Sequence, residues 1–363
     1  MKKLAVFALL LVLCLCLCAC GESEKNSQVN SNIPTSVDEP TDNEPLSLPV
    51  LTKEATESIH NGLGNSITNY SDPICLLAEC AEYIFHSYGD NYQITMIEKS
   101  TDKSTLLPIY GTNLSIYDHS LYFLDPDHNF IYRYNFLDGS VDEADFPQKP
   151  DGWYSYEFLF VTSLGFIITY YQGSIDHYYC MLTDFNGTLL STFDGDFFDC
   201  GLLSDTTIAF RQLGNSQVTI LDLSNMEIST ISIPVEFSKV IDFDDGYIYG
   251  YQDDSRSATL LRVDPTNGSS MTIDLPNVKA TINYEHKKIL YYVSYDGTSA
   301  ISLDSNESFV FCKKYHLMHM TFTSDGYIYA TGGLQNSTDT IYWNTTKPVR
   351  IKVDGTDLKV LSE

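Results

Sequence analysis

Basic residues are scarce in this sequence. Lys and Arg together number 21, against 48 Asp and Glu in 363 residues, which gives a formal net charge of −27. A surface this negative repels nucleic acid and anionic lipid headgroups, so the composition excludes a nucleic-acid partner. The charge is typical of a soluble extracytoplasmic surface. Alternatively, it serves to attract cations or a basic partner.

Familiar catalytic and metal-binding motifs are missing as well. The sequence has no Gly-x-Ser-x-Gly elbow, no His-Glu-x-x-His pair and no glycine loop for phosphate. Beyond residue 20 the remaining five cysteines form no Cys-x-x-Cys pair, which disfavours a structural zinc site. Their odd number leaves at least one thiol free or bonded to another chain. We expect mostly buried free thiols, and a disulfide between Cys180 and Cys200 remains an alternative.

The one long apolar run lies at the N-terminus. Two lysines precede an apolar segment, Leu4–Leu17, which at roughly 14 residues is shorter than the ~20 that a membrane-spanning helix needs. The run ends in Leu-Cys-Ala-Cys20-Gly, which resembles a bacterial lipobox. The resemblance implies a lipoprotein signal peptide over 1–19 and a diacylglyceryl group on Cys20, and two acyl chains suffice for stable anchoring. We therefore expect a lipid-anchored protein on the extracytoplasmic face of the cell membrane.

The chain changes character after Cys20. Residues 21–43 are mostly Ser, Asn, Glu, Asp, Pro and Thr, and such a segment buries too little apolar surface to offset its ordering entropy. We assign 20–58 to a disordered acidic tether and 59–363 to one folded domain. Without the two signal-peptide lysines the formal charge is 19 − 48 = −29.

An internal repeat follows the tether. The chain contains 26 Tyr and 19 Phe and has no convincing amphipathic helix, which favours strands. A short aromatic or aliphatic strand recurs at intervals of 38 to 45 residues, close to the length of a four-stranded propeller blade. The seven segments begin at Glu82, Ser120, Gly165, Thr206, Gly246, Lys288 and Gly326.

An Asp-led turn follows most of these segments, and a further strand comes after it. Asp binds the backbone of its own turn, and Asn-Gly or Asp-Gly supplies the positive φ of tight hairpins. The turns begin at Asp138, Asp184, Asp222, Asp264, Asp304 and Asp354.

The repeat predicts an all-β fold: a single β-propeller of about seven four-stranded blades, with six or eight as alternatives. Three modes of ring closure stay open. The segment Leu46–Leu51 or Ser66–Asn69 adds a strand to the last blade, or the last unit is complete in itself.

Several short sequence segments resemble those of a known family. These are Asn61-Gly-Leu-Gly-Asn-Ser-Ile67, Asp-Gly-Tyr-Ile-Tyr at Asp245 and Asp325, and Val349-Arg-Ile-Lys-Val-Asp-Gly-Thr-Asp-Leu358. They resemble the uncharacterised β-propeller domains of lipoproteins from Gram-positive bacteria, which look distantly like the propellers of lipoprotein receptors. The resemblance covers roughly residues 60–363 and implies a propeller. It carries over no catalytic residue. The sequence departs from the pattern in its first half, where Asp-Gly does not precede the aromatic strand.

The best candidates for a metal site are acidic loops. Asp125, Asp127 and Asn129 offer oxygen ligands of the kind that Ca²⁺ prefers. Two other clusters are Asp194-Gly-Asp196 with Asp199, and Asp242-Phe-Asp244-Asp245. None of the three reproduces a full calcium loop, and a solvated turn in which Asp binds its own backbone explains each of them. We expect no cofactor and no metal, with Ca²⁺ at Asp125, Asp127 and Asn129 as the alternative.

Aromatic residues occur in runs such as Trp153-Tyr-Ser-Tyr156 and Tyr291-Tyr292. Neighbouring residues of a strand point to opposite faces, and both faces of a blade meet other blades, so we expect these side chains between blades. The alternative is a platform on which a glycan or a peptide stacks.

We therefore predict a monomeric, surface-anchored lipoprotein that is not an enzyme and acts as a binding or protein-interaction scaffold. Its partner would be an envelope protein or a glycan. One alternative is a glycan-active hydrolase or lyase with carboxylates at the propeller channel, and another is a sensor or accessory protein of an envelope complex.

Overall fold

The computed structural model divides the chain into two units, Met1–Pro45 and Leu46–Glu363. The structure describes residues of the second unit only. The described ranges are 48–57, 77–88, 92–127, 129–147, 155–162, 164–172, 177–195, 197–204, 206–212, 217–232, 239–244, 247–251, 259–286, 288–334 and 347–361. Cys20, the signal segment, the tether up to residue 47 and the segments 61–67 and 66–69 lie outside them.

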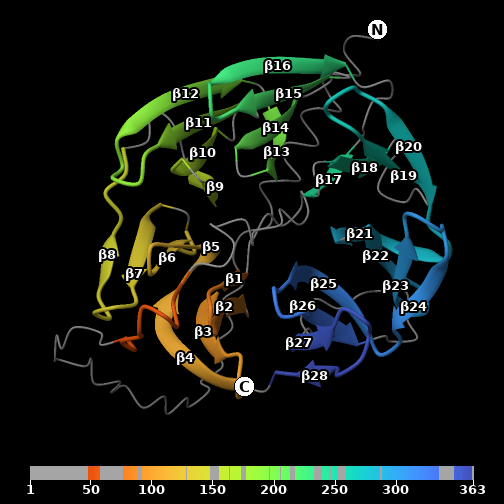
Figure 1. Ribbon diagram of the computed structural model, residues 1–363, viewed down its shortest axis with the longest axis horizontal. Helices are drawn as coiled ribbons and strands as arrows, with labels where there is room; N and C mark the ends of the chain where they lie inside the picture. The colour runs from red at the N-terminus through yellow and green to blue at the C-terminus, as the bar shows by residue number, and fades with distance from the viewer. Residues whose placement is uncertain are drawn as a thin grey trace, which may run out of the picture. The chain divides into compact units, whose positions relative to one another are not determined.

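Strands are the only regular elements in this part of the chain. They form seven four-stranded antiparallel sheets, and each sheet is built from four strands that are consecutive in sequence (Figure 1). The described residues form no helix, and so none that could cross a bilayer. We number the sheets 1 to 7 in chain order.

The strands of each sheet have the following bounds. Sheet 1 contains β1 (Leu77–Glu79), β2 (Tyr83–Tyr88), β3 (Gln93–Glu98) and β4 (Lys103–Tyr110). Sheet 2 contains β5 (Thr112–Tyr117), β6 (Ser120–Leu124), β7 (Ile131–Asn135) and β8 (Val141–Glu143). Sheet 3 contains β9 (Ser155–Val161), β10 (Phe166–Gln172), β11 (His177–Thr183) and β12 (Leu189–Gly195). Sheet 4 contains β13 (Phe197–Ser204), β14 (Thr207–Gln212), β15 (Gln217–Asp222) and β16 (Glu227–Ser232). Sheet 5 contains β17 (Lys239–Asp244), β18 (Tyr247–Tyr251), β19 (Thr259–Val263) and β20 (Ser270–Asp274). Sheet 6 contains β21 (Val278–His286), β22 (Ile289–Ser294), β23 (Gly297–Ser302) and β24 (Ser308–Cys312). Sheet 7 contains β25 (Tyr315–Phe322), β26 (Tyr327–Leu334), β27 (Lys347–Lys352) and β28 (Lys359–Val360).

The sequence repeat corresponds to these sheets one for one. Each of the seven predicted aromatic or aliphatic strands is the second strand of a sheet, from β2 in sheet 1 to β26 in sheet 7. The six predicted Asp turns connect the third strand to the fourth in sheets 2 to 7. The prediction of an all-β fold built from four-stranded units is confirmed.

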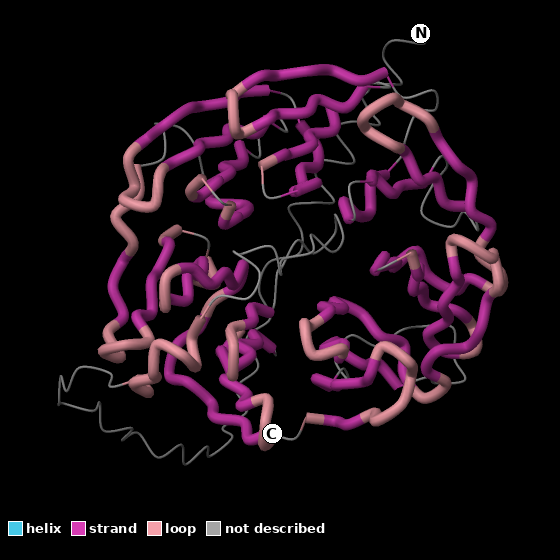
Figure 2. Tube along the Cα trace, viewed as in Figure 1, coloured by secondary structure: helices cyan, strands magenta, loops and turns pink. Residues whose placement is uncertain are grey.

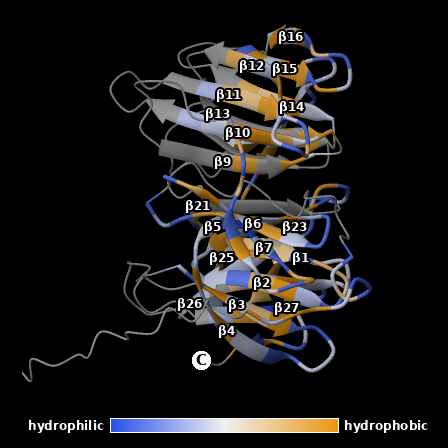
Figure 3. Ribbon diagram, turned by 90° about the vertical axis from the view of Figure 1, so that its left-hand side faces the viewer, coloured by the Kyte–Doolittle hydropathy of each residue, from blue (hydrophilic) through white to orange (hydrophobic). Residues whose placement is uncertain are grey.

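The strands of a sheet differ in their surroundings. First strands approach the first strands of neighbouring sheets, as β1 does with β5 and β13 with β17, and they lie innermost (Figures 1 and 2). Fourth strands are exposed, and five of the six residues of β16 have exposed side chains. Hydrophilic residues gather at the turns (Figure 3), while the fourth strands still expose some hydrophobic side chains, such as Ile228 and Phe309.

The core lies between the sheets, as the aromatic runs predict. Tyr291 and Tyr292 are adjacent on β22 and both are buried. Tyr291 packs in a cluster with sheet 7, whereas Tyr292 packs in a cluster with Tyr249 of sheet 5. Because alternate residues of a strand point to opposite faces, sheet 6 buries one tyrosine on each side.

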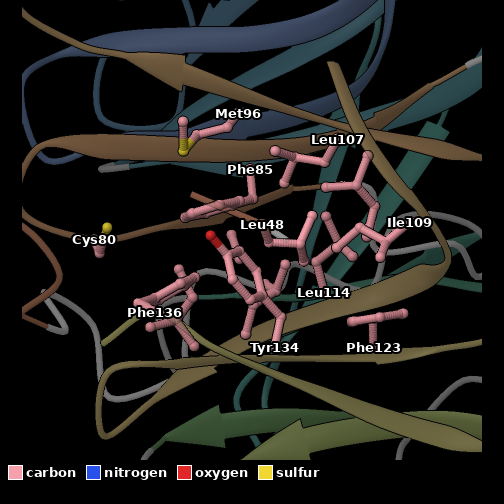
Figure 4. Close-up of a cluster of buried hydrophobic side chains, with 14 residues drawn as sticks. Leu48, Cys80, Phe85, Met96, Leu107, Ile109, Leu114, Phe123, Tyr134 and Phe136 are labelled. Carbon is pink, nitrogen blue, oxygen red and sulfur yellow. The ribbon is translucent and has the colours of Figure 1, made fainter. Parts of the chain in front are cut away.

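A segment before the first sheet, Leu48–Glu57, packs on sheets 1 and 2, and we call it the N-terminal strap. Leu48 lies in the buried cluster of these sheets with Phe85, Leu114 and Tyr134 (Figure 4). The Leu51 amide donates to the Phe136 carbonyl at 2.7 Å. The compact unit therefore starts at Leu46, earlier than the expected end of the tether at residue 58.

The strap is also hydrogen-bonded to the turns between the first and second strands of both sheets. In sheet 1 the amides of Ala81 and Glu82 donate to the carbonyls of Glu57 and Ala55 at 2.9 and 3.0 Å. In sheet 2 Thr56 Oγ1 lies 2.9 Å from His119 Nδ1. The strap adds no strand to sheet 7, in which β25 to β28 are consecutive in sequence. The other candidate for closing the ring, Ser66–Asn69, lies outside the described residues.

Sheets 1 and 7 meet along a seam. Its apolar part is a buried cluster of residues from both sheets: Leu77, Ile84, Ile97, Tyr329 and Leu361. Its polar part has two centres. Glu79 accepts hydrogen bonds from the amide and hydroxyl of Ser324 at 3.2 and 2.7 Å and forms an ion pair with Lys99. Asp102 forms ion pairs with Arg350 and Lys359.

Three cysteines are described, and all are buried free thiols. They are Cys80, Cys180 and Cys312, in agreement with the expectation for most cysteines. Burial raises the pKa of Cys80 to about 11 and that of Cys180 to about 12. Cys180 is free, so the alternative of a disulfide with Cys200 is not realised.

Candidate functional site

The predicted metal candidates lie in the loop between β6 and β7. One carboxylate oxygen of Asp125 accepts hydrogen bonds from the amides of Asn129 and Phe130 at 2.7 and 2.6 Å, and the other accepts from the Asp127 amide at 3.2 Å. The carboxylate thus closes its own loop, which is the solvated-turn arrangement. No group of three His, Cys, Asp or Glu side chains among the described residues could hold a metal ion.

The Asp turns form a second set of carboxylates, exposed at the outer part of sheets 2 to 7. In the Asp264 turn the amide and hydroxyl of Thr266 donate to the carboxylate at 2.8 and 2.6 Å. Such hydrogen bonds favour the charged form and lower the pKa of five of these carboxyl groups. The shift is seen at Asp138, Asp184, Asp222, Asp264 and Asp354.

These lowered pKa values predict a pH dependence of stability. A carboxyl group whose pKa is lower in the folded state stabilises the fold above its unfolded pKa, and this stability is lost as the pH falls through the folded pKa. We expect the urea midpoint to decrease between about pH 5 and about pH 3. Asp264→Asn should make the decrease shallower, because Asn keeps a turn acceptor but does not titrate. An unchanged slope would contradict this assignment.

The innermost strands share an irregularity. In six of the seven sheets the pairing of the first strand with the second contains a register shift, and only β1 pairs without one. A β-bulge places an extra residue on one strand, re-aims side chains and is common next to active sites. Asn113 of β5 lies in such a bulge with a φ of 52° and is buried. The centre of the domain is therefore lined by irregular backbone.

Acidic residues stand at several of these bulges. On β9 the register skips Glu157, between Tyr156 and Phe158. On β13 Asp199 pairs directly after a shift, and on β17 Asp242 does the same. The two acidic clusters noted in the sequence thus each contribute an aspartate to an innermost strand. Cα atoms of β13 and β17 approach within 8 Å. Glu157 gave no signal in the sequence, because only the strand pairing reveals its position.

The described side chains of the innermost strands include one carboxylate and one buried histidine. Glu79 is 6% exposed and is neutralised by Lys99, so it has a structural role in the seam. His316 of β25 is buried, and burial, followed by the charge of Lys279, lowers its pKa. The ring bonds to the Ser294 carbonyl, while Nε2 has no partner among the described residues. The imidazole at this position links sheets 6 and 7.

Comparison with known proteins identifies the fold and no family. No family model matches the sequence, and no curated protein does. Among solved structures, the β-propeller domain of the Trilobed protease from Pyrococcus furiosus, described as having an open velcro topology, is similar with a TM-score of 0.54 and 11% identity. The alignment covers 82% of this chain and 98% of that one.

Two enzymes share the fold. Oligogalacturonate lyase from Vibrio parahaemolyticus has a TM-score of 0.51 and 10% identity, with 82% of this chain and 91% of that one covered. Puromycin hydrolase has a TM-score of 0.56 and 8% identity, with 87% of this chain covered. This chain spans 57% of the length of puromycin hydrolase. At such low identity the likeness shows a propeller-like fold alone.

These structures overturn the expectation that the protein is not an enzyme. That expectation rested on the absence of contiguous catalytic motifs. Propellers similar to this one belong to a hydrolase and a lyase. In a fold whose centre is lined by separate sheets, reacting groups come from strands that are far apart in sequence, so a missing motif is no argument against catalysis. The chain is an all-β protein with a propeller-like fold.

Proposed function

We propose that this protein is a lipoprotein anchored outside the cell through Cys20, and that its seven sheets close into one propeller that cleaves a glycan at its centre. The seam between sheets 7 and 1 supports closure, because it joins residues about as far apart in sequence as the domain allows, such as Glu79 and Ser324. The lipobox-like N-terminus supports the anchor.

One observation carries the catalytic part of the proposal: acidic residues stand next to the bulges of neighbouring innermost strands. Asp199 on β13 and Asp242 on β17 both follow a register shift. Glycoside hydrolysis uses two carboxyl groups, separated by about 5 to 10 Å, on either side of the scissile bond. Strands β13 and β17 have Cα atoms within 8 Å of each other, so carboxyl groups carried by these two strands can come within that range.

The chemistry assigns complementary roles to this pair. One carboxylic acid protonates the oxygen of the leaving sugar, and the other, as carboxylate, activates a water molecule or attacks the anomeric carbon. Glu157 of β9 is a third acid at the centre of the domain, on the sheet before β13. The strong negative charge of the chain favours a neutral or cationic glycan over an anionic one.

The test is hydrolysis of a panel of cell-envelope glycans by the full-length protein and by the variants D199N and D242N. We expect each variant to lose at least about 100-fold in rate, because each removes an acid or a base from the reaction. The matched control is D304N, which changes an exposed carboxylate of an Asp turn. Activity that survives in both variants, or falls equally in D304N, would reject this site.

The anchor has a separate test. Cys20→Ala removes the only sulfur at the lipidation position, so incorporation of radiolabelled palmitate should stop and the signal segment should stay attached. Cys18→Ala is the control, because it lies in the same segment and should leave labelling intact. A Cys20→Ala protein that still takes up label would refute the anchor without affecting the glycan proposal.

A further inference from the structure

A row of aromatic side chains crosses sheet 2 on the face toward sheet 1. Phe123 of β6 pairs with Tyr132 of β7, and Tyr132 pairs in turn with Glu143 of β8. Directly opposed residues of a sheet share a face. The rings of Phe123 and Tyr132 are stacked with centroids 5.8 Å apart. The row therefore runs from the buried Phe123 outward to the exposed Glu143.

Phe130 extends this row into solvent. Its ring is 45% exposed and lies 6.2 Å from the Tyr132 ring at an angle of 50°. We call these two inclined rings the corner. Phe130 is held in place, because its amide donates to Asp125 Oδ1 at 2.6 Å and its carbonyl accepts from the Asp125 amide at 3.0 Å. A large apolar ring is thus fixed in an exposed position.

The corner lies in a negative field. Burial raises the pKa of Tyr132, and the charges of Asp125 and Glu143 raise it further. Arg133, the basic residue of the same strand, forms an ion pair with Asp142 at 3.7 Å. Both residues lie on the opposite face of the sheet, because neighbouring residues of a strand point to opposite faces. Aromatic faces and carboxylates together attract cations, and proteins commonly bind quaternary ammonium groups against the faces of aromatic rings.

The hydrogen bonds of Asp125 select between kinds of cation. Its two carboxylate oxygens already accept three amides of their own loop. It supplies charge but few free lone pairs, which a primary ammonium with three donors needs. A trimethylammonium group needs none. We propose that the corner formed by Phe130 and Tyr132 binds a trimethylammonium group, with Glu143, the cross-strand neighbour of Tyr132, as an exposed counter-charge. This site is independent of the proposed catalytic centre.

The experiment is a ligand-observed NMR titration of the full-length protein with choline, in a detergent that has no cationic head group. We expect saturation transfer to the methyl protons and a millimolar dissociation constant, as for a small ligand at an exposed two-walled site. Phe130→Ala should weaken binding about fivefold, and Glu143→Gln should weaken it by a smaller factor. Both residues are exposed, so neither change disturbs the core.

Three controls can overturn the assignment. The uncharged isostere 3,3-dimethylbutan-1-ol should bind more weakly than choline, and equal binding would show a merely apolar patch. Lysine should also bind more weakly, and equal or tighter binding would reject the trimethylammonium group as occupant. Phe309→Ala removes a ring of β24 that is 49% exposed, and it should leave the titration unchanged. A loss as large as that of Phe130→Ala would contradict a specific site.

Discussion

Arg350→Met is expected to lower the free energy of unfolding by about 3 kcal/mol, because it breaks a largely buried ion pair at the seam between sheets 7 and 1. The Arg350 side chain is 7% exposed and bonds to Asp102 and, at 3.3 Å, to Asp357. Its guanidinium also lies 4.2 Å from the centre of the Tyr327 ring. Met keeps the length and the apolar stem, so the loss reports the charge. Equilibrium unfolding in urea measures it.

Lys288→Met is the matched control. Lys288 pairs with Asp304 at 3.2 Å, but the two side chains are 59% and 71% exposed. Solvent screens such a pair, so its removal should change the stability by less than about 1 kcal/mol. If both substitutions cost the same, the seam does not depend on Arg350 and the apolar cluster alone holds the two sheets together.

Gly165→Ala is expected to destabilise the fold by about 3 kcal/mol, through backbone strain and overlap together. Gly165 has a φ of 155°, and a Cβ atom there would lie 1.8 Å from the Thr183 carbonyl oxygen. That oxygen belongs to the backbone of the neighbouring strand β11, which pairs with Phe166. Neither side can yield without breaking the pairing, so the thermal midpoint should fall clearly.

Gly326→Ala separates the two causes. Gly326 occupies the equivalent place before the second strand of sheet 7, and it also has a positive φ, of 83°. A Cβ atom there would meet nothing within 4 Å. Its replacement should therefore cost only the conformational strain, about 1 kcal/mol. Equal losses in the two variants would show that overlap with Thr183 plays no part.

These two glycines mark how far the sequence could be interpreted. Both stand directly before a predicted strand, Gly165 after Leu164 and Gly326 after Asp325, and neither neighbour indicates which glycine is crowded. The strand itself was predictable because its aromatic residues and the following Asp turn are local signals, and hydrogen bonds such as that of Thr266 to Asp264 span only two residues. The space around the Cα atom of a glycine depends on a neighbouring strand, and the local sequence pattern carries no information about that strand.

The seam and the strap were not predictable for the same reason. The bond between Glu79 and Ser324 joins residues 245 positions apart, and nothing near either residue indicates the other. The bulges of the innermost strands depend on how the strands pair, which the sequence does not show. Asp199 and Asp242 were therefore noted only as parts of acidic clusters, and Glu157 was not noted at all. The corner at Phe130 was hidden in a loop that we interpreted as a calcium candidate. In that loop the Asp125 carboxylate accepts hydrogen bonds from the loop backbone, and the exposed ring of Phe130 is the distinctive feature.

The strap also determines how mechanical force enters the domain. Any pull on the chain before Leu48 reaches the sheets through the strap, which holds sheet 1 by the amides of Ala81 and Glu82 and sheet 2 by the carbonyl of Phe136. The load is shared by two sheets from the start, and neither the innermost strands nor the seam with sheet 7 receives it first. Force applied to the leading end of the chain therefore loads the strap before it loads the innermost strands.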